Sequence, residues 1–182
     1  MLGLQPFNPI ALRATAAEDR PQSLRFLEKR GFQEVIRDIP SELDLQSFDL
    51  SRFSGLEESF QAYGVQIKTL PELEGDPERN QKLYDLDWEM SLSVPGDLAA
   101  GIGRRGLDQY VEYAITGPNA LPGGFFVAVK GDEYIGLSHV LMREKGVSLY
   151  QGLTSVKPQY RRLGIGLAMK VRAIAYAKAN GY

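Results

Sequence analysis

The sequence predicts an α/β fold, with helices on an α+β mixed sheet, in a main domain over residues 63–182. Three apolar runs separated by short glycine-containing turns predict an antiparallel meander, and a long apolar helix follows them. The composition, 43% hydrophobic and 24% charged over 182 residues, is that of a globular protein. A chain of this length has room for one good core, whereas two complete domains would be cramped.

Residues 1–46 are expected to form a strand, a helix and a strand. Pro21 can open the helix and Gly31 can end it. The flanking strands are predicted at 10–14 and from residue 32 onward, where apolar and polar side chains alternate. The unit has the size of a βαβ motif but no sheet of its own to join.

Residues 47–62 are mixed and turn-prone, so we expect a linker there, followed by a strand at 63–70. Asp76 and Pro77 mark the start of a helix, as its cap and its first helical residue. A second short helix is predicted from one apolar face, made by Leu107, Tyr110, Val111, Ala114 and Ile115.

The meander is predicted at 125–129, 134–142 and 147–156, and the last helix at 164–180. This helix carries two apolar stripes, so it should be sandwiched between two layers.

Charge and composition exclude several classes of function. The 21 basic and 23 acidic side chains give a net charge of -2, which favours neither nucleic acid nor an anionic membrane as a partner. The absence of cysteine and the single histidine leave no predicted metal site. No apolar run approaches a membrane span and the N-terminus resembles no signal peptide, so a cytoplasmic protein is expected.

The stretch from Thr154 to Gly166 is the candidate ligand-binding segment, because it is predicted to run from a strand through a tight turn into a long helix. The first N–H groups of a helix lack intrahelical acceptors and lie at the positive end of its dipole. Gly164 and Gly166 remove side chains that would keep a phosphate away. The cations that surround the turn are Lys157, Arg161 and Arg162. This pattern predicts a diphosphate site.

The same stretch resembles the signature of the GNAT superfamily (GCN5-related N-acetyltransferases), which Arg161, Gly164 and Gly166 match, with Val156 and Pro158 at the family's spacing before them. The resemblance implies a GNAT-like fold with acetyl-CoA or coenzyme A as acyl donor. The N–H groups of the turn would hold the pyrophosphate, and the strand would pair by its backbone with the pantetheine arm. The residues thus assigned to the cofactor are Ser155, Val156, Arg161, Arg162, Leu163, Gly164, Ile165 and Gly166.

Residues 27–32 match a pattern that ends the last helix of many GNAT domains. Residues 1–46 therefore resemble the end of one GNAT domain and residues 63–182 the first two thirds of another, so the chain looks like a segment of a tandem-GNAT protein. The family pattern requires a further strand beside residues 147–156. We expect the N-terminal unit to supply it, in cis as a permuted domain or in trans as a swapped homodimer.

The family's usual catalytic groups are missing. The position of its glutamate base is Tyr150, and that of its tyrosine acid is Leu27. Tyr150 and Thr154 alternate onto one strand face, where either could hold a water molecule or the acceptor amine; packing of the sheet is the alternative for both. A structural role is favoured for His139. Gly152 is either a close approach for ligand backbone or a packing glycine under an aromatic ring.

The resemblance implies an N-acyltransferase that moves an acetyl group from acetyl-CoA to a primary amine, on a small molecule or as an exposed amino group. The alternative is a non-catalytic coenzyme A-binding module of a tandem protein, which the missing carboxylate favours. A third hypothesis is an unrelated protein that binds a nucleotide phosphate at the glycine turn. The G-x-G-x-x-G at 101–106 does not follow a predicted strand, so we interpret it as a loop between two helices. The resemblance to GNAT proteins implies that this loop lies on the acceptor-amine side of the cleft.

Overall fold

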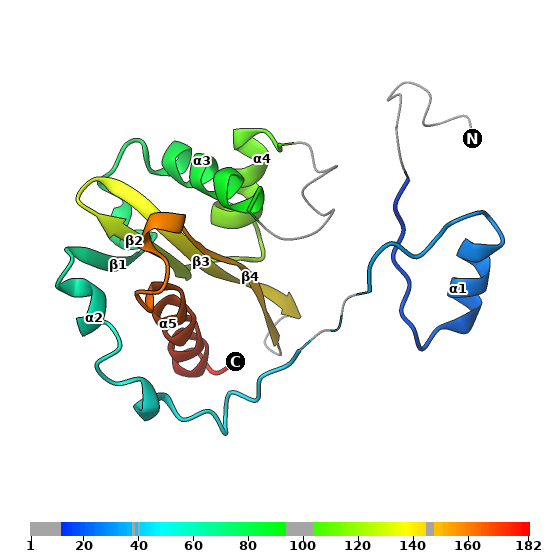
Figure 1. Ribbon diagram of the computed structural model, residues 1–182, viewed down its shortest axis with the longest axis horizontal. Coiled ribbons are helices and arrows are strands. Elements are labelled where there is room, and N and C mark those ends of the chain that lie inside the picture. The colour runs from blue at the N-terminus through cyan, green and yellow to red at the C-terminus, as the bar shows by residue number, and fades with distance from the viewer. Residues whose placement is uncertain (1–11, 38, 40, 94–103, 145–147) are drawn as a thin grey trace. The chain divides into compact units, whose positions relative to one another are not determined.

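The computed structural model describes residues 12–37, 39, 41–93, 104–144 and 148–182, and the chain divides into two units between residues 42 and 43 (Figure 1). The second unit contains an antiparallel sheet in the order β1–β2–β3–β4. Its strands are β1 (Val65–Thr69), β2 (Ala120–Lys130), β3 (Glu133–Glu144) and β4 (Ser148–Val156). The predicted meander and the strand before it are confirmed.

Helices cover both faces of this sheet (Figure 1). One face packs against α3 (Arg79–Ser91), α4 (Leu107–Val111) and a π-helical turn, η4 (Glu112–Thr116). The other face packs against α5 (Ile165–Ala179). Leu167 is 47% exposed, and the other members of its stripe, Val171, Ile174 and Ala175, are only partly buried. In the described residues this stripe is therefore not covered by a full second layer, as a sandwiched helix would require.

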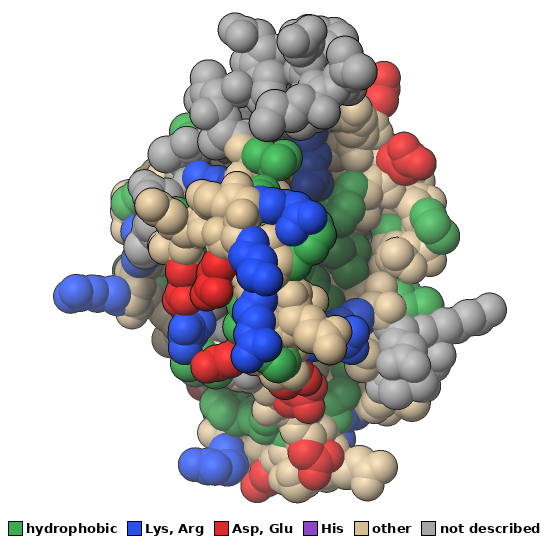
Figure 2. All heavy atoms as spheres, turned by 90° about the vertical axis from the view of Figure 1, so that its right-hand side faces the viewer, with side chains coloured by type: hydrophobic (Ala, Val, Ile, Leu, Met, Phe, Trp, Pro, Cys, Tyr) green, Lys and Arg blue, Asp and Glu red, His purple; other side chains and the backbone are tan. Residues whose placement is uncertain are grey.

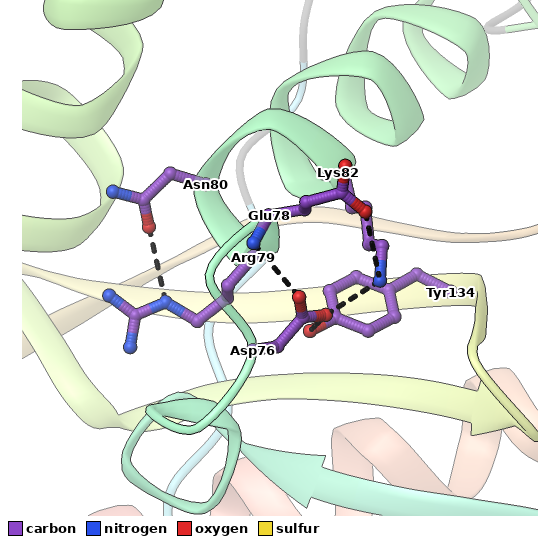
Figure 3. Close-up of polar contacts among 6 residues, drawn as sticks. All are labelled: Asp76, Glu78, Arg79, Asn80, Lys82 and Tyr134. Carbon is purple, nitrogen blue, oxygen red and sulfur yellow. Dashed lines mark hydrogen bonds and ion pairs between the residues drawn. The ribbon is translucent and has the colours of Figure 1, made fainter.

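Asp76 fixes the start of α3 to the sheet (Figure 3). One carboxylate oxygen accepts the N–H of Glu78 at 2.9 Å, and the other accepts Lys82 Nζ at 2.8 Å and Tyr134 Oη at 2.9 Å. These hydrogen bonds lower the pKa of Asp76, and the bond from Lys82 has the largest effect. The helix itself begins at Arg79, with Glu78 as its N-cap and no side chain capping it. The prediction that Asp76 caps the helix and Pro77 opens it is therefore wrong by two positions, because the Asp76 carboxylate closes a turn that precedes the helix.

Residues 50–61 belong to the domain and are not the free linker that their composition predicts. They form the turn η2 (Leu50–Phe53) and the short helix α2 (Glu58–Gln61). Phe60 is completely buried in the core on the α5 side. Arg172 of α5 donates to both carboxylate oxygens of Glu57, at 2.6 and 2.7 Å, and to the carbonyl of Ile67 at 2.9 Å.

The first unit contains the predicted helix, α1 (Pro21–Glu28), but residues 12–17 and 32–37 form no strand, contrary to the sequence prediction. A strand needs a neighbour for its backbone groups, and no described residue of this unit is buried. Its exposed large apolar side chains are Leu12, Phe26, Val35, Ile36 and Ile39. Residues 10 and 11 of the predicted first strand lie outside the described residues, as do residues 94–103, which include the first half of the G-x-G-x-x-G at 101–106.

Phe60→Ala should lower the free energy of unfolding by about 3–5 kcal/mol, because it leaves a cavity in a packed core. The matched control is Phe26→Ala, at a ring that is 53% exposed, which should change stability by less than ~1 kcal/mol. Urea unfolding of the full chain measures both. Equally small losses would mean that residues 50–61 are a linker after all.

Candidate cofactor-binding site

A groove of about 370 Å³ opens where β4 ends and α5 begins. Its volume lies within the range of small-molecule sites. The residues that line it are Thr154, Ser155, Val156, Tyr160, Arg161, Arg162, Gly164, Ile165, Gly166 and Leu167. The structure therefore brings together every residue that the sequence assigns to the cofactor except Leu163, whose side chain packs into the α5-side core.

The turn that forms the groove has two residues in the left-handed region, Arg162 with φ 67° and Gly164 with φ 81°. Glycine adopts this conformation without steric cost, whereas a residue with a Cβ atom loses roughly 1–2 kcal/mol. Strain of this kind persists where the surrounding structure holds it, and it concentrates at binding sites.

The N-terminus of α5 faces the groove through residues 165–167. The N–H of Ala168 bonds back to the carbonyl of Gly164 at 2.9 Å, and no side chain caps the helix. The three preceding N–H groups have no acceptor within the helix, and the helix dipole adds positive potential there. This end of α5 is therefore suited to an anion.

Gly166 keeps the groove open. A Cβ atom at this position would lie 3.8 Å from Val156 Cγ2 and 4.0 Å from Thr154 Cγ2, both ordinary contacts with other groove residues. A larger side chain would project from the same point into the space that a ligand needs.

Two of the three cations around the turn, Arg161 and Lys157, are engaged by the protein itself. Arg161 Nε donates to the carbonyl of Val156 at 2.8 Å, which closes the turn onto the end of β4. Lys157 Nζ lies 2.8 Å from Glu133 and 3.8 Å from Glu89. Figure 2 shows basic and acidic side chains next to one another on the face that it displays, as expected for a chain with 21 basic and 23 acidic residues. Attraction for an anion thus depends more on the backbone N–H groups than the sequence suggested.

Tyr150 and Thr154, which alternation predicts on one face of β4, are separated by a register shift between β3 and β4. Gln151 Nε2 donates to Ser138 Oγ at 3.2 Å and to Thr154 Oγ1 at 3.3 Å, and the two hydroxyl oxygens lie 2.8 Å apart. Residue 151, and not 150, therefore shares the face of Thr154. Tyr150 is 55% exposed and does not line the groove.

His139 is buried beneath this irregularity, stacked on Phe125 with ring centroids 5.0 Å apart. A Cβ atom on Gly152 would overlap the imidazole, so Gly152 is the packing glycine of the two alternatives. Neither ring nitrogen has a hydrogen-bond partner among the described residues. Burial lowers the pKa of His139 to about 4, which makes it a poor proton acceptor at neutral pH.

Sequence reasoning missed one unusual carboxyl group, Asp87 on α3. Burial raises its pKa to about 6, against the opposing effect of Arg105. The buried Tyr110 hydroxyl has no partner among the described residues, and burial and Asp87 raise its pKa. Its spacing in the sequence could have indicated its burial. Residue 87 lies four positions after Leu83 and three before Met90, which places it beside the buried stripe of α3. It lies in the layer on the opposite face of the sheet from α5.

No protein-family model matches the sequence, and no curated protein shows significant similarity to it. Among solved structures, the chain is similar to a GCN5-related glucosamine N-acetyltransferase region of a fungal multi-domain GH3 β-N-acetylglucosaminidase. The TM-score is 0.54 at 12% identity, over 92% of this chain and 20% of that chain. The domain has the GNAT fold.

Two further solved structures give lower scores. A GCN5-related N-acetyltransferase from Sphaerobacter thermophilus has TM-score 0.46 and 16% identity, over 92% of this chain and 46% of that one. An N-acetylglutamate synthase from Neisseria gonorrhoeae, complexed with coenzyme A and N-acetyl-glutamate, has TM-score 0.43 and 18% identity, over 64% and 23%. The chain thus spans less than half the length of each of these three structures.

In this GNAT-fold chain, no described helix is both long and apolar enough to cross a membrane. The described residues also contain no group of three or more His, Asp or Glu side chains arranged for a metal ion.

His139 should make the protein sensitive to acid. Its folded-state pKa of about 4 lies below its ordinary value of 6.5, so the unfolded state binds the proton first and stability falls as pH drops from 6.5 to 4. The loss is up to about 3 kcal/mol. Asp87 acts oppositely, because its raised pKa favours proton uptake by the folded state below about pH 6.

The measurement is the free energy of unfolding from pH 7 to pH 4. His139→Leu should reduce the acid loss, and Asp87→Asn should steepen it. The slopes with pH, and not the absolute stabilities, are compared. Parallel slopes in all three proteins would contradict this assignment.

Proposed function

We propose that this protein is an N-acetyltransferase that transfers the acetyl group of acetyl-CoA to a primary amine, on a small molecule or as an exposed amino group. The observation that carries the proposal is the groove at the start of α5, lined by the residues of the GNAT signature. The GNAT fold of the domain supports it. When bound, acetyl-CoA would supply the activated acetyl thioester.

The chain's own contribution to donor binding is mostly backbone. The N–H groups of Gly164, Ile165 and Gly166 would hold the diphosphate, since this helix end lacks a side-chain cap. The pantetheine arm would lie along β4 near Ser155 and Val156. Val156 already accepts a bond from Arg161 at its carbonyl, so its neighbours in β4 would provide most of the pairing.

The reaction joins the amine nitrogen to the acetyl carbonyl carbon as the carbon–sulfur bond breaks, and the proton lost by the amine balances the proton gained by the thiolate. The residues that line the groove include no Asp, Glu or His. Thr154 offers a hydroxyl, which already shares a hydrogen bond with Ser138. Catalysis would therefore rest on positioning the two reactants, with water accepting the proton.

A second candidate is a non-catalytic coenzyme A-binding module of a tandem GNAT protein. The observation in its favour is the side chain at the usual site of the glutamate base, which here is the exposed Tyr150. This candidate predicts donor binding without turnover.

Replacing Gly166 by Leu should weaken coenzyme A binding at least ~10-fold, because the side chain would fill the groove. Gly75→Leu is the matched control, since that glycine has open space around it and does not line the groove. Isothermal titration with coenzyme A and with ATP measures both. Equal affinity in wild type and Gly166→Leu would place the donor elsewhere, and binding of ATP alone would favour the unrelated nucleotide-phosphate site.

Release of free thiol from acetyl-CoA, with a panel of amines, separates the enzyme from the binding module. Tyr150→Phe should leave turnover unchanged, because Tyr150 lies outside the groove. Thr154→Ala should reduce it less than ~100-fold, the lower limit expected for a general acid or base. A larger loss in either variant would identify a proton-transfer residue, and coenzyme A binding without thiol release for any amine would favour the module.

A further inference from the structure

The segment before β1 contacts the turn of the groove from behind. Ser59 of α2 donates from Oγ to the carbonyl of Leu163 at 3.1 Å. The carbonyl of Leu56, 2.9 Å away, shares the same hydroxyl hydrogen in a three-centre bond, which fixes the hydroxyl at the end of its own helix. Leu56 Cδ1 would lie 3.3 Å from a Cβ atom on Gly164. Two residues of this segment therefore meet the peptide that joins Leu163 to Gly164.

The contact with Leu163 fixes the direction of the next N–H group. A trans peptide is planar, and its C=O and N–H bonds point in opposite directions. The described residues contain no cis peptide. Because the carbonyl of Leu163 points toward Ser59, the N–H of Gly164 points away from α2. Gly164 lines the groove, so its N–H is available on the side where a ligand would lie.

A second contact holds the segment in place. Glu57 receives two bonds from Arg172, at 2.6 and 2.7 Å. Arg172 belongs to α5, the helix whose N-terminus forms the groove. Residues 56–59, which we call the brace, are thereby attached to the turn at one end of α5 and to the middle of the same helix.

We propose that Ser59 is a positioning residue for the donor site: it orients the Leu163–Gly164 peptide so that the Gly164 N–H reaches the coenzyme A diphosphate. This inference rests on the proposed function. Ser59 itself does not line the groove, so its effect passes through the peptide and not through contact with the ligand. It also gives the segment before β1 a part in cofactor affinity.

The test measures the dissociation constant of coenzyme A for Ser59→Ala, Ser59→Thr and a control, in the full chain. Ser47→Ala is the control, because it also removes a serine hydroxyl bonded to a backbone carbonyl, that of Asp44, without touching the turn. We expect Ser59→Ala to weaken binding roughly threefold to tenfold, the effect of one hydrogen bond. Ser59→Thr keeps the hydroxyl and should restore affinity. Circular dichroism at the titration temperature establishes that each variant is fully folded.

Wild-type affinity in Ser59→Ala, with coenzyme A bound by the wild type, would overturn the role of Ser59 and leave the proposed function intact. The same would follow if Ser59→Thr were as weak as Ser59→Ala. Failure of the wild type to bind coenzyme A would overturn the proposed function, and this inference with it.

Discussion

The chain reverses direction between Val156 and Ile165, and the candidate site depends on the geometry of this reversal. The positive φ angles of Arg162 and Gly164 bring the start of α5 next to the end of β4. The bond from Arg161 to the carbonyl of Val156 then closes the turn. Because α5 packs on the sheet along its length, its uncapped N-terminus is held at one place. Neither the strand nor the helix alone would form a groove.

The parts of the structure that depend on local sequence were predictable. The glycines and the proline around 156–166 specify the turn, and the apolar runs specify the meander, because turn conformation and strand alternation are properties of adjacent residues. Asp76 and Pro77 indicated the region where α3 begins for the same reason, although its N-cap is Glu78, two residues later. All of these signals fall within a few residues of the feature that they predict.

The remaining features depend on contacts across the fold. Phe60 is buried by α5 and the sheet, which its mixed surroundings could not indicate. The register shift near Gly152 arises between two strands, so alternation along one strand assigned Tyr150 to the wrong face. The strands predicted in the first unit failed because alternation alone supplies no neighbour to pair with. The pKa of Asp87 is raised by burial, which arises only when the domain folds around it.

The brace also has a consequence for the order of folding. The residues that it joins are far apart in the chain: Ser59 and Leu163 are separated by 104 positions, and Glu57 and Arg172 by 115. The meander, by contrast, pairs strands that follow one another directly. Contacts that close long loops cost more chain entropy and slow folding. We therefore expect the sheet to form before the two ends of the domain meet, and the groove to reach its final geometry among the last steps, after most of the core is already in place.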